Sequence, residues 1–205
     1  MRLNLERSLR YLLAWSPAIV LPRAMPAQRA VADAVVQSGT LSFVGHATVG
    51  DFIGTTTSVT GALLGSHEYA ATRGWVEAPV GTLATGNERR DRDLRASMEV
   101  TRYPTMRFDL SGATFVTSEF GTPDSSVVVL HGSLSLHGVT RRVDLPATVM
   151  RRADTTRVTS VFGLDLGDYG IGGLTKMFGL LRMQRAIDVR VDLRFVDRPL
   201  IEAGR

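Results

Sequence analysis

A two-residue alternation of apolar and polar side chains constrains this chain more than any other feature of its sequence. In residues 127–137 the apolar positions are Val128, Leu130, Leu134 and Leu136, and the polar positions are His131, Ser133, Ser135 and His137. In residues 186–197 the apolar Ile187, Val189, Val191, Leu193 and Phe195 alternate with Asp188, Arg190, Asp192 and Arg194. Because successive side chains of a strand point to opposite faces, both segments predict strands with one buried and one wet face. Such strands belong to antiparallel sheets.

Six further segments show a weaker form of the same alternation. They are residues 39–48, 51–63, 69–83, 105–116, 141–150 and 157–166. Short stretches rich in Gly, Pro, Asp and Ser separate them, as hairpin turns require. Eight antiparallel strands predict an up-and-down barrel or a sandwich. The 205 residues, with no cysteine, fit one domain that has a core of its own.

Two segments depart from this period. Residues 88–95 combine a high charge density with Leu94, and Asn87 precedes them as an N-cap, which predicts a short surface helix. Residues 171–183 are apolar, and Leu174, Met177, Phe178 and Leu181 recur there at helical spacing. This second segment predicts either an amphipathic cap on one barrel end or a flap over a ligand entrance.

The first 32 residues resemble a leader rather than part of the domain. A basic stretch precedes an apolar run at 11–21 and a small-residue region that ends at Ala32, the order typical of a secretory signal peptide. The apolar run is about half the ~20 residues of a membrane-spanning helix. We therefore expect export, with residues 33–205 as the mature domain.

The charge of the chain also lies in this leader. Residues 1–30 carry five arginines and one acidic residue, which leaves 19 basic and 19 acidic side chains in the rest of the chain. A domain with balanced charge lacks the basic surface that nucleic acids require, so we expect no nucleic-acid partner.

The sequence offers little support for an enzyme. It contains no nucleophile elbow, no phosphate-binding loop and no dinucleotide fingerprint. His131 and His137 share a strand face but lie roughly 20 Å apart at ~3.3 Å per residue, too far to hold one metal ion. His46 and His67 have no acidic partner at a recognisable spacing. We expect no catalytic residue, no metal and no cofactor.

Two groups of side chains have both a structural and a functional interpretation. The arginines of residues 89–95 alternate with Asp91 and Asp93, which favours a solvated helix start over a site for an anionic headgroup. The aromatic side chains of the predicted strands either fill a core or line a cavity. The sequence pattern alone leaves both questions open.

Five segments, taken in order, resemble the YceI-like family of secreted bacterial proteins, which bind lipids or polyisoprenoids. They are GHATVGDFIG (45–54), GNERRDRDLRA (86–96), YPTMRF (103–108), GSLSLHGVTR (132–141) and DYGI (168–171). The fourth, a hairpin with His-Gly at its turn, is the most specific. The chain departs from the family pattern at 38–42 and at Asp93.

The resemblance implies an all-β fold, an eight-stranded antiparallel lipocalin-like barrel that holds a long apolar chain. It also implies a periplasmic or secreted bacterial protein, for which transient contact with a membrane is open and a protein partner unknown. We expect the tunnel to be lined by Phe43, Phe52, Trp75, Phe108, Leu134, Leu136, Phe162 and Ile171. A polar headgroup is expected near Arg92 or Arg95, and a gate at one mouth from Leu174, Met177, Phe178 and Leu181.

Two other functions stay open at this stage. A barrel filled by its own side chains would serve as a structural or protein-interaction module. An enclosed apolar pocket with a polar group such as His46 or Tyr169 would suit a lipid isomerase or cyclase. Neither a filled barrel nor such an enzyme would carry a lipid and release it unchanged.

Overall fold

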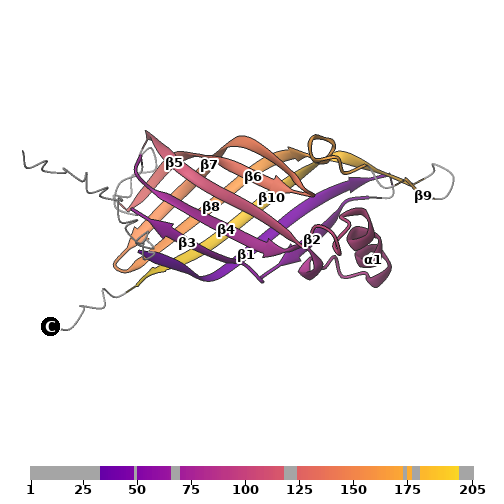
Figure 1. The fold of residues 1–205 in the computed structure, drawn as a ribbon, viewed down its shortest axis with the longest axis horizontal. Helices are drawn as coiled ribbons and strands as arrows, with labels where there is room; N and C mark the ends of the chain where they lie inside the picture. Colours follow the sequence, from indigo (N-terminus) through magenta and orange to yellow (C-terminus); the bar gives the residue numbers. More distant parts are fainter. Residues whose placement is uncertain are drawn as a thin grey trace, which may run out of the picture.

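The computed structural model describes residues 33–48, 50–65, 70–117, 124–172, 175–176 and 181–198, and these form an antiparallel β-barrel (Figure 1). Its strands are β1 (Ala34–Ala47), β2 (Phe52–Thr56), β3 (Thr60–Leu64), β4 (Arg73–Pro79), β5 (Thr105–Thr117), β6 (Ser125–Leu136), β7 (Val139–Arg152), β8 (Thr155–Asp165), β9 (Thr175–Lys176) and β10 (Leu181–Asp197). A helix, α1 (Glu88–Ser97), and two 3₁₀ turns, η1 (Val80–Thr82) and η2 (Leu166–Tyr169), complete the described part. The predicted signal peptide lies outside the described residues.

The barrel closes because β1 pairs on both of its sides. One side pairs with β10, from Ala34 with Asp197 to Gly45 with Ile187 and on to Ala47. The other side pairs with β2 near its end and with β3 near its start, so β2 and β3 together occupy one position of the barrel. The wall therefore has eight strand positions, which confirms the predicted fold class and selects the barrel over the sandwich.

Strand alternation places the apolar side chains inside, as predicted. Val128 and Leu136 of β6 are buried, and so are Val189, Leu193 and Phe195 of β10. The β6–β7 hairpin has only His137 and Gly138 between paired residues, both with positive φ (51° and 77°). Two positive φ angles define the type I′ turn that matches strand twist, and glycine supplies one of them without strain. The most specific motif of the sequence is thus a tight turn.

The predicted helix is present and lies at one end of the barrel (Figure 1). Asn87 is its N-cap, and the side-chain oxygen accepts hydrogen bonds from the backbone N–H groups of Arg89 and Arg90. The buried Asp91 carboxylate accepts from the backbone and hydroxyl of Thr85, and these bonds lower the pKa of Asp91. Leu94 and Met98 join the core cluster that fills this barrel end. The helix is thereby fixed by both polar and apolar contacts.

The helical conformation that the spacing of residues 171–183 indicates is wrong where the structure describes this segment. Thr175–Lys176 form β9, which pairs with Leu181 and Arg182 at the start of β10. The chain here extends the β10 strand, because the ladder satisfies backbone groups that a short isolated helix would leave to water. Three of the expected gate residues, Leu174, Met177 and Phe178, lie outside the described residues.

The ladder between β7 and β8 is incomplete. It runs from Arg152 and Thr155 to Ala147 and Ser160 and then stops, although β7 extends back to Val139 and β8 on to Asp165. Both strands remain paired on their other sides, β7 with β6 and β8 with β10. We call the region between residues 139–146 of β7 and 161–165 of β8 the seam.

Pro146 explains why the ladder stops at this point. The Ser160 hydroxyl donates to the Pro146 carbonyl at 2.6 Å, so that carbonyl faces β8. The nitrogen and oxygen of one residue in an antiparallel strand point to the same side. The Pro146 nitrogen therefore also faces β8, and it carries no proton to donate.

Replacing Asn87 with alanine should destabilise the domain by about 1 kcal/mol, because two N–H groups of α1 lose their acceptor. Urea unfolding of the two proteins measures the difference. Asn87→Asp keeps an acceptor and should stay near the parent. An unchanged free energy of unfolding for Asn87→Ala would contradict the capping role.

Candidate functional site

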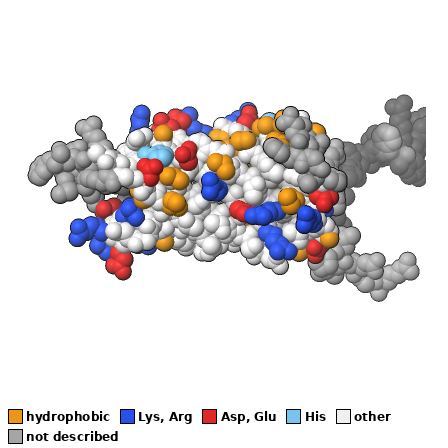
Figure 2. Space-filling view, turned by 180° about the vertical axis from the view of Figure 1, so that it is seen from behind, with side chains coloured by type: hydrophobic (Ala, Val, Ile, Leu, Met, Phe, Trp, Pro, Cys, Tyr) orange, Lys and Arg blue, Asp and Glu red, His pale blue; other side chains and the backbone are white. Residues whose placement is uncertain are grey.

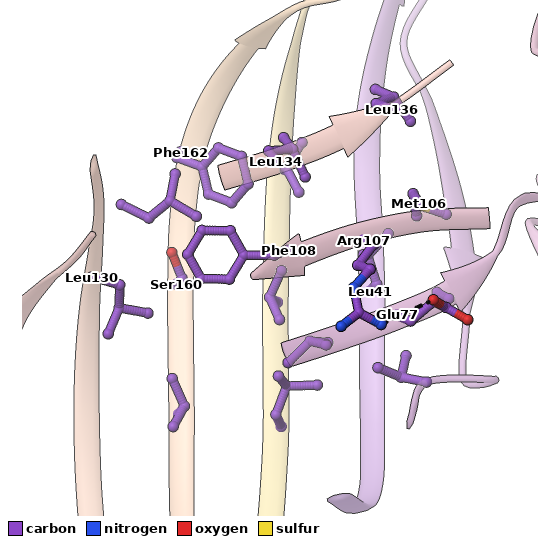
Figure 3. A pocket seen from close by; sticks show the side chains of 18 of the residues that line it. Leu41, Glu77, Met106, Arg107, Phe108, Leu130, Leu134, Leu136, Ser160 and Phe162 are labelled. Carbon is purple, nitrogen blue, oxygen red and sulfur yellow. Dashed lines mark hydrogen bonds and ion pairs between the residues drawn. The ribbon is translucent and has the colours of Figure 1, made fainter. Parts of the chain in front are cut away.

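The barrel interior holds a cavity of about 210 Å³ with an almost wholly apolar wall (Figure 3). On β8 the lining extends from Thr156 to Leu164, which is roughly 26 Å of strand at about 3.3 Å per residue. The volume is below the ~300–1,000 Å³ of pockets for drug-sized ligands. A small volume spread over such a length describes a narrow tunnel.

Several inward-facing side chains are only half-buried, which places free space beside them. Phe108, Leu130, Leu134, Phe162 and Leu164 all line the cavity with intermediate exposure. Side chains in a filled barrel would be inaccessible at these positions. Figure 3 shows Phe108, Phe162 and Leu134 directed into the same space from β5, β8 and β6.

The structure brings most of the predicted tunnel residues together. The cavity wall includes Phe43, Phe108, Leu134, Leu136 and Phe162, whereas Trp75 borders the cavity with its ring on the other face of the strand. Phe43 fits because its partner on β2 is Gly54, where any Cβ would collide with the ring. Phe52 and Ile171 are not part of the wall. The Phe52 ring packs edge-on against Phe43 at 6.0 Å, and Ile171 is buried in the cluster that closes the helix end.

Trp75 differs from the other aromatic residues of the wall. Its ring lies 4.8 Å from the Arg107 guanidinium, which also pairs with Glu77 and Asp109. Strand register places these four residues on one face, opposite to Val76 and Phe108. The Trp75 ring is therefore on the outer face, where a cation–π contact compensates its exposure.

Neither arginine expected near a headgroup lines the cavity. Arg92 is exposed and lies 3.9 Å from Glu88, and Arg95 donates to the Gly81 carbonyl at 3.3 Å. Arg90, which belongs to the same arginine-rich segment but is not one of the two expected headgroup residues, covers the Phe52 ring at 4.5 Å. Leu94 of α1 lines the cavity, and none of the charged residues of this helix is part of the wall.

The opposite end of the tunnel has polar groups. Thr156 is buried in the wall, and its hydroxyl has no hydrogen-bond partner among the described residues. Its cross-strand neighbour Arg151 forms an ion pair with Asp197 at 3.0 Å. These groups make this end the more polar one.

His46 and His131 are not part of the tunnel wall. His46 has acidic partners that the sequence spacing did not indicate, Asp51 at 3.0 Å and Asp188 at 3.5 Å. The hydrogen bond to Asp51 raises the pKa of His46 above its ordinary 6.5, and Asp188 adds to this. His131 bonds Thr114 and Asp144 on the outer face, as expected of a solvated strand histidine.

The described residues contain no candidate metal centre. No cluster of three or more histidine or acidic side chains among them could hold a metal ion. Tyr169 is buried, and burial raises the pKa of its phenol, which keeps the proton on it at neutral pH. None of the helices in the described ranges has the length and apolarity to cross a bilayer.

Charges of both signs are interspersed on the surface. On the face in Figure 2, acidic and basic side chains lie beside one another, and hydrophobic ones form small separate groups. The balanced charge of the body is thus also balanced locally on this face.

Sequence reasoning missed two features of this site. One is Pro146. Its place inside a predicted strand indicates a local loss of strand pairing, because proline in sheets is confined to edge strands, strand starts and bulges. The other is Arg141, the first residue of the predicted strand 141–150, which shares the inner face with its partner Leu134. Alternation counted across the hairpin from Leu134 would have found it.

Comparison with known proteins supports a single family. A family model described as YceI-like domain matches residues 33–195. No curated protein matches. A polyisoprenoid-binding domain from Saccharophagus degradans is similar over 82% of this chain and 100% of its own, with 15% identity and a TM-score of 0.64.

Two further solved structures share the fold. Burkholderia cenocepacia BcnA matches 76% of this chain and 95% of its own, with 14% identity and a TM-score of 0.62. The Campylobacter jejuni YCEI protein matches 69% of this chain and 82% of its own, with 14% identity and a TM-score of 0.54. At such identities the likeness concerns the barrel itself.

Replacing Asp51 with asparagine should lower the pKa of His46, because the hydrogen bond to Asp51 is the main cause of its rise. Since the folded pKa is raised, protonated His46 stabilises the fold fully below pH 6.5, and this contribution is lost as pH rises through the folded pKa. NMR titration of the imidazole measures the shift. Asp144→Asn serves as the control, and an equal change at His46 in both variants would contradict the assignment.

Proposed function

The chain belongs to the YceI-like domain family, and from this premise we propose that it is a non-enzymatic carrier of a long apolar lipid. The observation that supports the proposal best is the narrow apolar tunnel along the barrel axis. The Saccharophagus neighbour is named for polyisoprenoid binding, which makes a polyisoprenoid or a similar acyl chain the first candidate ligand.

The energetics of the tunnel favour a long chain over a short one. Burying one methylene contributes about 0.8 kcal/mol. Association costs about 4–15 kcal/mol in lost freedom, so a chain must bury many methylenes before it binds at all. A lining of roughly 26 Å along β8 provides that length.

The tunnel wall offers a lipid enclosure rather than chemistry. Thr72, Thr156 and Ser160 are the neutral polar residues of the described wall, and the charged Glu77 and Arg107 pair on its outer face. Met98, Met106 and Met183 add side chains that adapt to ligands of irregular shape. This composition supports binding by length and girth, with the ligand returned unchanged.

The location follows from the leader. Residues 1–32 have the order of a signal peptide, so we place the mature domain, residues 33–205, in the periplasm or outside the cell. A lipid carrier there would receive its cargo in transient contact with a membrane.

Mature protein purified without detergent should carry a lipid. Native mass spectrometry, followed by organic extraction, measures the extra mass and identifies the cargo. A stoichiometric prenyl or acyl lipid is the expected result. A clean apo mass that persists after incubation with geranylgeraniol would favour a filled barrel, and a chemically altered lipid would favour an enzyme.

Replacing Leu134 with tryptophan should block the tunnel, because the larger ring projects into space that the ligand needs. We expect at least about tenfold weaker binding of N-phenyl-1-naphthylamine, measured by its fluorescence. Arg194→Trp, on the exposed face of β10, is the matched control. Equal binding by Leu134→Trp and the parent, with the fold retained by circular dichroism, would contradict a tunnel site.

A further inference from the structure

The seam between β7 and β8 is an interruption of the tunnel wall. Val143 and Leu145 of β7 and Phe162 and Leu164 of β8 face inward along it, and all four are half-buried. Strand N–H and C=O groups that lack ladder partners pair with water or with side chains instead, which favours access of water to the seam. The seam therefore joins an apolar interior to solvent at the side of the barrel.

The outer face of β8 beside the seam is also exposed. Val161 is 56% exposed although it is apolar. A side chain added at Gly163 would meet no atom within 4 Å. Nothing among the described residues covers this part of the wall.

Both ends of the seam are closed by polar contacts. At the end where the β7–β8 ladder stops, the Ser160 hydroxyl donates to the Pro146 carbonyl. At the end near the β6–β7 turn, η2 follows β8, and Arg141 Nε of β7 donates to the Asp168 carbonyl of η2 at 2.7 Å. His137 Nδ1 lies 3.2 Å from the Tyr169 carbonyl and holds η2 from the β6–β7 turn. These contacts frame a side window.

Arg141 starts from the inner face of the barrel. It pairs with Leu134, whose side chain lines the tunnel, and cross-strand partners share a face. Its guanidinium reaches the window and is half exposed, with Nη2 3.4 Å from the Asp168 carboxylate. That carboxylate is itself 57% exposed, and an ion pair so open to water contributes little stability.

We propose that the seam is the entrance of the tunnel and that Arg141 binds the anionic head of the lipid there. The head carries carboxylate or phosphate oxygens, which match the fork of a guanidinium, and it displaces the Asp168 carboxylate when it binds. The tail lies in the tunnel beside Leu134. This inference rests on the proposed lipid-carrier function and adds the chemistry of the head and its route.

Two other sites compete for the head. Arg92 and Arg95 contact Glu88 and the Gly81 carbonyl and are not part of the tunnel wall. Arg151 lies at the opposite end, where its ion pair with Asp197 is shorter, at 3.0 Å. The seam is favoured because an exposed guanidinium there meets an interruption of the wall.

The test compares two lipids that share a tail, geranylgeranyl diphosphate and geranylgeraniol, as competitors of N-phenyl-1-naphthylamine. The variants are Arg141→Gln, Arg151→Gln and, as a matched control, Arg142→Gln, the next residue on the outer face. Arg141→Gln should weaken the diphosphate at least about tenfold and change the alcohol less than twofold. Asp168→Asn should strengthen the diphosphate, because it removes the competing carboxylate.

The outcomes separate this inference from the proposed function. If the parent protein binds neither lipid, both fail. If the parent binds the alcohol but Arg141→Gln shows no loss selective for the diphosphate, only the head site fails. A selective loss in Arg151→Gln instead would place the head at the opposite end.

The route has its own test, because a chain without cysteine accepts a unique one. Val161→Cys labelled with a polyethylene glycol maleimide should slow probe uptake and release several-fold, measured by stopped flow, at unchanged affinity. Ile53→Cys, equally exposed at 60%, is the control and should keep the parent rates when labelled. Equal rates in both labelled proteins would overturn the seam as entrance.

Discussion

The ladder between β1 and β10 is the interaction on which the rest of this structure depends. It joins the two ends of the described sheet over the length of β1 and converts an open sheet into a barrel. Closure removes the two edges of the sheet and gives the inward side chains an interior without water. Without this ladder, Phe43, Val189 and Leu193 would lie on the face of an open sheet, and no tunnel would exist.

A closed barrel of eight strand positions imposes a choice between a filled core and a slender cavity. Here the two solutions divide the interior. The cluster around Leu94, Met98, Tyr169 and Ile171 fills the helix end, while Phe108, Leu134 and Phe162 leave space in the middle. Apolar packing therefore positions α1 on the barrel. The hydrogen bonds that Asp91 accepts from Thr85 and Asn87 accepts from Arg89 fix the start of the helix.

The seam shows how one residue can modify a closed wall. Pro146 withholds a single N–H from β8, and the ladder does not resume beyond it. The cost in stability is limited because Ser160 still donates to the Pro146 carbonyl, and because Arg141 of β7 donates to the Asp168 carbonyl of η2 at the other end of the seam. The barrel can therefore have an opening in its wall and still keep the rest of its strand pairing.

The sequence by itself determined most of the strands, the α1 helix with its Asn87 cap and the His137–Gly138 turn, because these depend on local alternation and local hydrogen bonds. It also indicated most of the tunnel residues, since alternation assigns a face once a strand is known. The single strand predicted at 51–63 is wrong, since β2 and β3 divide this segment. The segment at 171–183 misled the prediction because its helical spacing could not reveal the extension of β10. Only the tertiary structure decided that the Trp75 ring lies outside, that His46 meets Asp188, and that Arg141 reaches the seam. Those outcomes depend on register between strands distant in sequence, and register is set by closure of the whole barrel.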